Sequence, residues 1–285
     1  MSSMNRKMIK IIPVLAISLG LFACSEAAKE PEITEDNTEN TTQNEAPLVQ
    51  LKNTTKPVFF DFTSTGCPGC GSWGKPSFNS IISDFEDDIV PMAIHIKYGD
   101  KMITPVSEAI GSNRTGQFYT PQLWVNNSNG MQLSAGRINS TGSVDRIKGL
   151  IETFKTETPD IQVGVTESIN DKELSVRVKT KANEDLDGEY FLGVYVMENG
   201  LSYNQSSSPA NPTIHDHVIR TSNNGGFGNT LSSESLVANS EFDDVLTFNL
   251  EDDWNKENVY VTAIIWKKNG SIYTVVNADN NFTKE

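Results

Sequence analysis

Apolar and polar positions repeat with different periods in the two halves of the chain. Up to about residue 158, short apolar runs alternate with stretches in which apolar residues recur every three or four positions, the spacing of a helix that buries one face. The predicted order is strand 58–62, helix 72–85, strand 89–97, a short helix 106–110, an antiparallel hairpin of strands 121–125 and 132–135, and helix 143–154. This order indicates an α/β domain over residues 48–158.

From about residue 160 the helical spacing disappears. Leu174, Val176 and Val178 alternate with polar neighbours, which is typical of a strand with one buried face. Runs of this kind cover 161–168, 173–180, 190–197, 215–221, 243–250, 259–266 and 271–277, separated by joints rich in Asn, Asp and Gly. Seven short strands with frequent turns predict an all-β sandwich of immunoglobulin-like type over residues 160–285. Modules of this kind bind or brace far more often than they catalyse.

The first 23 residues have the pattern of an export signal. Three basic residues precede an apolar run, 11–22, that is too short to span a bilayer. The letters LFAC at 21–24 resemble the bacterial lipoprotein signal, in which cleavage before the cysteine leaves it lipidated. The resemblance implies a signal peptide at 1–23, a lipid anchor on Cys24 and, because Ser25 follows, the outer membrane, on its periplasmic or its cell-surface face. The alternative is an ordinary cleaved signal that leaves Cys24 a free thiol.

Residues 24–47 are rich in Glu, Asn and Thr and almost lack large apolar side chains. Such a segment cannot bury enough apolar surface to offset the conformational entropy lost on folding. The sequence therefore predicts a disordered acidic tether between the lipid and the folded part.

Composition narrows the range of partners. The 285 residues carry a formal net charge of -14, and 21% are charged. Nucleic acid requires a basic face, so DNA and RNA are excluded as partners. The polar composition is typical of a folded protein that meets the membrane through its anchor.

The one motif that carries chemistry follows the first predicted strand. Cys67-Pro68-Gly69-Cys70 lies where the strand gives way to a helix, and the free N–H groups of a helix start stabilise a thiolate. Cys67 is the candidate nucleophile, and Cys70 lies one turn later on the same face, within reach of a disulfide. With Cys24 lipidated, these two can pair only with each other or transiently with a partner. A permanently closed structural disulfide is the alternative, and zinc lacks two further ligands.

The stretch from about residue 56 to 156 resembles the thioredoxin superfamily. The strand leading into C-x-x-C, the helix after it, Thr120-Pro121 before a strand, and the closing hairpin and helix carry the resemblance. It implies that Pro121 follows a cis peptide bond and lies against the disulfide. It also implies that Asp61 is a buried carboxylate that assists deprotonation of Cys70, although an exposed Asp on an edge strand fits the alternation equally well.

Two departures from that family lie in the motif itself. Gly66 stands where the family has Trp, and Pro68-Gly69 replaces Gly-Pro between the cysteines. Gly69 loosens the helix start, so the reduction potential does not follow from the resemblance.

Histidines offer little further chemistry. His95, among aliphatic residues on a predicted strand, is expected to be a hydrogen-bonded core residue. His215 and His217 are expected on one strand face, where two imidazoles without a third ligand favour a polar surface over a metal site. No metal and no cofactor are predicted.

The His-x-His-Val-Ile-Arg segment at 215–220, followed by the glycines at 225–228, adds a second resemblance. Together with the lipoprotein signal and the two halves, it resembles the outer-membrane-protein-28 family of Gram-negative lipoproteins. That resemblance implies location and architecture but no activity.

The leading hypothesis is an outer-membrane-anchored thiol–disulfide oxidoreductase acting on thiols or disulfides of cell-envelope proteins. Cys67 would attack, Cys70 would resolve the mixed disulfide, and Pro121 would shape the peptide-binding edge. The alternatives are a non-catalytic binding or structural lipoprotein with an inert disulfide, and a carrier whose β half docks glycans or proteins.

Overall fold

The computed structural model describes residues 48–97 and 99–282. The predicted signal peptide, the lipidation site Cys24 and the acidic tether lie outside these residues. Within them, no helix is both long and apolar enough to cross a membrane.

The first half alternates strands and helices. β1 and β2 are buried along their whole length, which explains why both read as continuous apolar runs and not as alternating ones. Its elements are β1 (Val58–Thr63), the π-helical turn η1 (Cys70–Gly74), α1 (Lys75–Phe85), η2 (Glu86–Asp88), β2 (Val90–His95), α2 (Pro105–Ser112), β3 (Gln122–Val125), β4 (Ser128–Asn129), β5 (Leu133–Ser134), β6 (Arg137–Ile138) and α3 (Ser140–Phe154).

The predicted hairpin of 121–125 with 132–135 is wrong in its pairing. β3 pairs instead with β4, Trp124 opposite Asn129, and the later residues form the separate small hairpin β5–β6. Asn126 has a positive φ of 50°, a conformation that asparagine tolerates and that closes a tight turn directly after β3. The turn therefore follows β3 at once, several residues earlier than the predicted hairpin requires.

The second half is built from strands. Six of the seven predicted strands correspond to β7, β8, β10, β16, β17 and β18, whereas the predicted run 215–221 is divided between the end of β12 and β13. The full set is β7 (Ile161–Asn170), β8 (Glu173–Ala182), β9 (Leu186–Asp187), β10 (Glu189–Glu198), β11 (Leu201–Tyr203), β12 (Thr213–His215), β13 (Val218–Ser222), β14 (Asn229–Ser232), β15 (Ser235–Leu236), β16 (Glu241–Asn249), β17 (Val259–Asn269) and β18 (Ile272–Asn280), with the short turn η3 (Lys256–Asn258) before β17.

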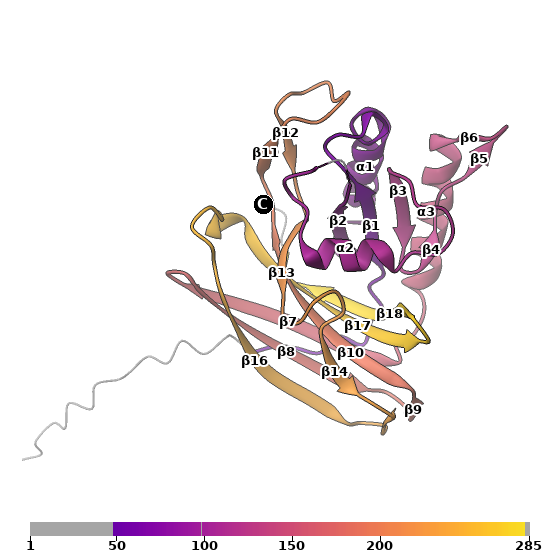
Figure 1. Cartoon of the computed structure of the whole chain (residues 1–285). Coiled ribbons are helices and arrows are strands. Elements are labelled where there is room, and N and C mark those ends of the chain that lie inside the picture. The colour runs from indigo at the N-terminus through magenta and orange to yellow at the C-terminus, as the bar shows by residue number, and fades with distance from the viewer. Residues whose placement is uncertain (1–47, 98, 283–285) are drawn as a thin grey trace, which may run out of the picture. The chain divides into compact units, whose positions relative to one another are not determined.

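One mixed sheet runs through both halves (Figure 1). Its order is β18-β17-β10-β13-β2-β1-β3-β4, with β14 also paired to β10. β1 is parallel to β2 and antiparallel to β3, and β13 joins β2 in parallel at Val218 and Ala93. The Ala93 N–H donates to the His217 carbonyl at 2.7 Å. The two stretches that the sequence suggests as separate domains therefore share a backbone-bonded sheet.

Packing divides the interior into layers. α1 and α3 cover one face of β1 and β3 around Phe59, Phe78 and Ile147. A second sheet, β16-β8-β7, packs against β10 and β17 around a separate apolar cluster. A third cluster joins Phe60 and Trp124 of the first half to Trp266 of the second. The protein has a mixed α/β fold with much of its chain in sheets.

Candidate functional site

The two cysteines lie in the turn between β1 and α1. The Cys67 N–H donates to the Ser64 carbonyl at 3.1 Å, which closes the turn after the strand. Cys67 and Cys70 form a disulfide with their Cα atoms 5.3 Å apart. The Cys70 N–H lies 3.1 Å from the Cys67 sulfur and 3.2 Å from the Cys67 carbonyl oxygen, so a donor at the start of the helix is shared between the first sulfur and the backbone.

Pro121 lies against this turn. The Thr120–Pro121 peptide bond is cis, as the thioredoxin resemblance implies. A Cβ placed on Gly69 would stand 3.2 Å from Pro121 Cδ, and one on Gly74 would stand 2.8 Å from Pro121 Cβ. Glycine at both positions is what allows the proline ring to approach the disulfide segment.

A loop from the second half covers the motif, and no pattern in the sequence indicates this contact. The loop joins β11 to β12, and Figure 1 shows this hairpin beside α1. Gln205 Nε2 lies within 3.2 Å of the Ser64, Thr65 and Cys67 carbonyl oxygens, and the Ser206 N–H donates to the Thr65 carbonyl at 2.8 Å. Cys67 keeps 5% of its surface exposed and Cys70 only 1%.

Asp61, whose position the sequence left open, is buried. Only 2% of its surface is exposed, so the edge-exposed alternative does not hold. Burial raises the pKa of Asp61 to about 7, although the nearby Lys75 ammonium and a hydrogen bond with Thr63 oppose the rise. Burial holds the pKa of Lys75 below its usual value, although the nearby Asp216 and Asp61 carboxyl groups oppose this shift. A carboxyl that titrates near neutral pH can exchange a proton under working conditions.

His95 is a buried, hydrogen-bonded residue, as its surroundings predict. Its Nδ1 lies 2.7 Å from Asp100 Oδ2. Burial raises the pKa of Asp100, but the hydrogen bonds from His95, Met102 and Thr65 outweigh it and lower the pKa to about 2. The Thr65 N–H donates to Asp100 at 2.7 Å, so this carboxylate also fixes the start of the cysteine turn.

The expectation that His215 and His217 share one strand face is wrong. β12 ends at His215, and His217 adopts a positive φ of 59° before β13 begins, so the strand is interrupted between them. The His215 ring packs edge-on against His95, 5.4 Å between centroids, whereas His217 Nδ1 lies 2.8 Å from the Tyr260 hydroxyl. No group of three or more His, Cys, Asp or Glu able to hold a metal occurs in the part of the chain that the structure describes.

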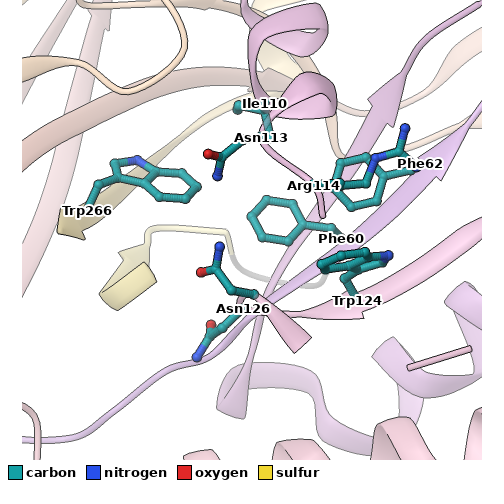
Figure 2. Close-up of a pocket in the computed structure, with 9 residues that line it drawn as sticks. Phe60, Phe62, Ile110, Asn113, Arg114, Trp124, Asn126 and Trp266 are labelled. Atoms are coloured by element: carbon teal, nitrogen blue, oxygen red, sulfur yellow. The ribbon is translucent and has the colours of Figure 1, made fainter. Parts of the chain in front are cut away.

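An aromatic pocket between the halves is nearly filled (Figure 2). Phe60 lies between Trp266 and Trp124 in this view, with Arg114 beside Phe62. The Arg114 guanidinium stands 4.3 Å from the Phe62 ring centroid, and burial lowers its pKa to about 10. The free space is about 10 Å³, enough for one water at most. This pocket is therefore packing between the halves and not a substrate site.

A larger hollow of about 410 Å³ adjoins the cysteine turn. Thr65, Gly99 and Lys101 line one side, and Ser202, Tyr203 and Asn204 of the covering hairpin line the other. The approach to Cys67 is flanked by the exposed residues Gly66 and Pro68.

Comparison with known proteins identifies a family through one family model. Residues 119–284 match the family model described as outer membrane protein Omp28. The structure of HBP35 of Porphyromonas gingivalis is similar with a TM-score of 0.63 and 15% sequence identity, over 83% of this chain and 80% of that chain, a likeness of fold. A domain of the outer membrane lipoprotein Omp28 from Porphyromonas gingivalis gives a TM-score of 0.31 and 17% identity over 43% of this chain and 86% of that chain. No curated protein matches.

Proposed function

The chain belongs to the Omp28 family of outer membrane proteins, and from that premise we propose that it is a lipid-anchored thiol–disulfide oxidoreductase of the cell envelope. One observation carries the proposal. The Cys67–Cys70 disulfide closes the turn that leads into α1, with the Cys70 N–H directed at the Cys67 sulfur. That donor favours a thiolate on Cys67 once the disulfide is opened.

The surroundings of the disulfide support a thioredoxin-like first half. The order β2-β1-β3-β4, with the first pair parallel and the others antiparallel, brings Pro121 and the cysteine turn together. In the second half, two sheets that face each other across one apolar cluster support the immunoglobulin-like sandwich. Cys24 would carry the lipid, and envelope thiols or disulfides would be the partners.

Each residue has a role in the exchange. A substrate thiolate attacks the Cys67 sulfur, a mixed disulfide forms and Cys70 leaves with the electron pair of the broken bond. The second substrate thiol then displaces Cys67, so the substrate gains a disulfide and loses two electrons and two protons to Cys67 and Cys70. Asp61, with a pKa of about 7, supplies and recovers the proton of Cys70.

A second candidate is favoured by the covering loop. Both cysteines are at least nine-tenths buried, and Gln205 bonds the loop to the turn that carries them. A disulfide held under a loop in this way fits a structural brace in a binding lipoprotein, with the thioredoxin-like fold kept and its chemistry lost.

Redox titration of the full-length chain separates the two candidates. We expect equilibrium with glutathione to give a midpoint potential above about -300 mV, below which structural disulfides typically lie. Because the exchange is reversible, we also expect the dithiol form to reduce an insulin-type protein disulfide through attack by Cys67, and Cys67→Ser to abolish this reverse reaction. A midpoint below that limit, together with exchange that Cys67→Ser leaves unchanged, would establish the structural brace instead.

Trapping identifies the partners. Cys70→Ser leaves Cys67 unable to release a mixed disulfide, so envelope proteins caught on Cys67 report the clientele. The double variant Cys67→Ser with Cys70→Ser is the matched control, because it retains the fold but has no thiol for capture.

A further inference from the structure

A small cavity lies behind the cysteine turn and is lined from both halves of the chain. Asp61 and Lys75 line it from β1 and α1, His95 from β2, and Gln205, His215 and Asp216 from the covering hairpin and the loop after it. Its free volume is about 10 Å³, close to the smallest space that holds a water molecule. The site is polar, which is the other condition for a buried water.

Two buried atoms without partners belong to residues of this lining. Asp61 Oδ1 and His215 Nε2 are each shielded from solvent and have no hydrogen-bond partner among the residues that the structure describes. Asp61 is 2% and His215 4% exposed. Leaving two such acceptors unsatisfied costs on the order of 1–3 kcal/mol each, so a shared water that donates to both is strongly favoured.

The neutral imidazole of His215 can accept a hydrogen bond from such a water. Burial and, to a smaller extent, the nearby His95 and Lys75 lower the pKa of His215 to about 4. Asp100 and a hydrogen bond with the Tyr203 backbone oppose this shift. The ring is therefore neutral above that pH. Since Nε2 is the nitrogen without a partner, it presents a lone pair to the cavity.

We propose that a buried water joins Asp61 to His215, and that His215 is a positioning residue from the β half that controls how Asp61 takes up and releases its proton. The charged and titratable groups that face this pair are Lys75 from α1, His95 with Asp100 behind it, and Asp216 beside His215. A water donating to Asp61 stabilises its carboxylate, and His215 holds that water by accepting its other hydrogen.

The consequence for redox chemistry rests on the proposed function. When the disulfide is reduced, Asp61 passes a proton to Cys70 and recovers one released by the substrate thiol, so no proton is gained or lost overall. His215 takes no part in the electron transfer. It sets the pH at which Asp61 can perform this exchange, and it ties the covering hairpin to the chemistry of the first half.

The test measures Asp61 directly in the oxidised full-length chain. The carboxyl ¹³C shift of Asp61 is followed by NMR from pH 4 to 9 in the wild type and in His215→Leu. Losing the acceptor loosens the water and desolvates the carboxylate, so we expect the Asp61 midpoint to rise by about one pH unit, a tenfold gain in proton affinity. His215→Gln, which retains an acceptor, should restore the wild-type midpoint.

His217→Leu is the matched control, because His217 is equally buried two residues away but pairs with Tyr260. An Asp61 midpoint that is unchanged in His215→Leu, or moved equally in His217→Leu, overturns the proposal. Should His215→Leu not fold, the reciprocal measurement decides, because linkage requires Asp61→Asn to shift the His215 midpoint. A His215 midpoint indifferent to Asp61→Asn likewise overturns it.

These outcomes are distinct from those of the proposed function. The Asp61 titration needs no exchange activity, so the coupling can be established in a protein that fails to reduce disulfides. In a protein that does reduce them, the inflection in the pH dependence of the glutathione equilibrium should move with the Asp61 midpoint in His215→Leu and stay in place in His217→Leu.

Discussion

Asp61 lies on a fully buried strand, and its ionisation must affect stability as well as chemistry. Its pKa is raised by burial from an ordinary 3.8 to about 7, so between these values the unfolded chain loses a proton that the folded protein keeps. Folding stability conferred by the protonated group is complete below about pH 4 and is lost as pH rises to about 7.

Asp61→Asn removes this dependence while keeping the shape of the side chain. Relative to the wild type, we expect the variant to gain stability as pH rises from 4 to 7, by at most about 4 kcal/mol, and then to hold that gain at higher pH. Urea unfolding at a series of pH values measures it, with the exposed Asp171→Asn as the control for loss of a charge. A constant difference across the series would mean that Asp61 stays ionised in the folded protein.

At the level of single residues, the sequence indicated the chemistry but not its surroundings. The C-x-x-C spacing and Thr120-Pro121 are local patterns, and the structure brings them together. The depth of Asp61 could not be read from alternation, because β1 is buried on both faces and every position on it is equally hidden. His215 and Gln205 were missed as neighbours of the site because they lie about 140 residues away along the chain.

The hairpin of β11 and β12 is the element that covers the disulfide. Gly71, directly after Cys70, has no side chain where Ser206 and Ser208 of the loop approach. A Cβ there would overlap the Ser206 carbonyl oxygen and stand 2.8 Å from the Ser208 backbone nitrogen. Since both contacts are with backbone atoms, the loop would have to move.

Gly71→Ala is therefore expected to displace the loop from the disulfide. The overlap should cost about 1–3 kcal/mol of stability, and reduction of Cys67–Cys70 by dithiothreitol should become faster because the sulfurs are uncovered. Gly149→Ala on α3 is the control, since its Cβ meets nothing within 4 Å and should stabilise the helix by about 0.5–1 kcal/mol. Equal reduction rates in the two variants would show that the loop does not limit access.

Long elements were predictable where one physical signal dominated. The six long strands of the second half and the helices over 75–85 and 140–154 follow from periodicity. The shorter strands β11, β12 and β14 did not, because three or four residues within stretches rich in Ser, Asn and Pro carry no usable period. β11 and β12 form the hairpin that covers the motif, so the part of the site that depends most on tertiary contacts was also the hardest to predict from the sequence.

Across the whole molecule, the two halves are joined by more than the shared sheet. Asn113 and Asn127 of the first half bond the backbone of β18 in the second. The Asn113 side chain accepts from the Tyr273 N–H at 2.8 Å and donates to its carbonyl at 2.7 Å, while Asn127 accepts from the Val275 N–H at 2.7 Å. The two asparagine side chains thereby pair with backbone N–H and C=O groups of the edge strand β18, as a neighbouring strand would. Nothing in the sequence pattern distinguishes them from the other asparagines of surface turns.

The shared sheet and these asparagine contacts together form the seam between the halves. Because of this seam, we expect residues 48–282 to unfold as one cooperative unit. Replacing Asn113 and Asn127 together by Ala leaves β18 backbone groups unpaired and should cost about 2–4 kcal/mol. In native-state hydrogen exchange, the slowest amides of β1 and of β17 should lose protection by the same amount, because both exchange only through the shared unfolding. Asn269→Ala, whose side chain bonds the nearby Thr274 of β18, is the control. Loss of protection confined to β17 would mean that the α/β half retains its structure after the β half has opened, and that the seam is a contact between two independent folding units.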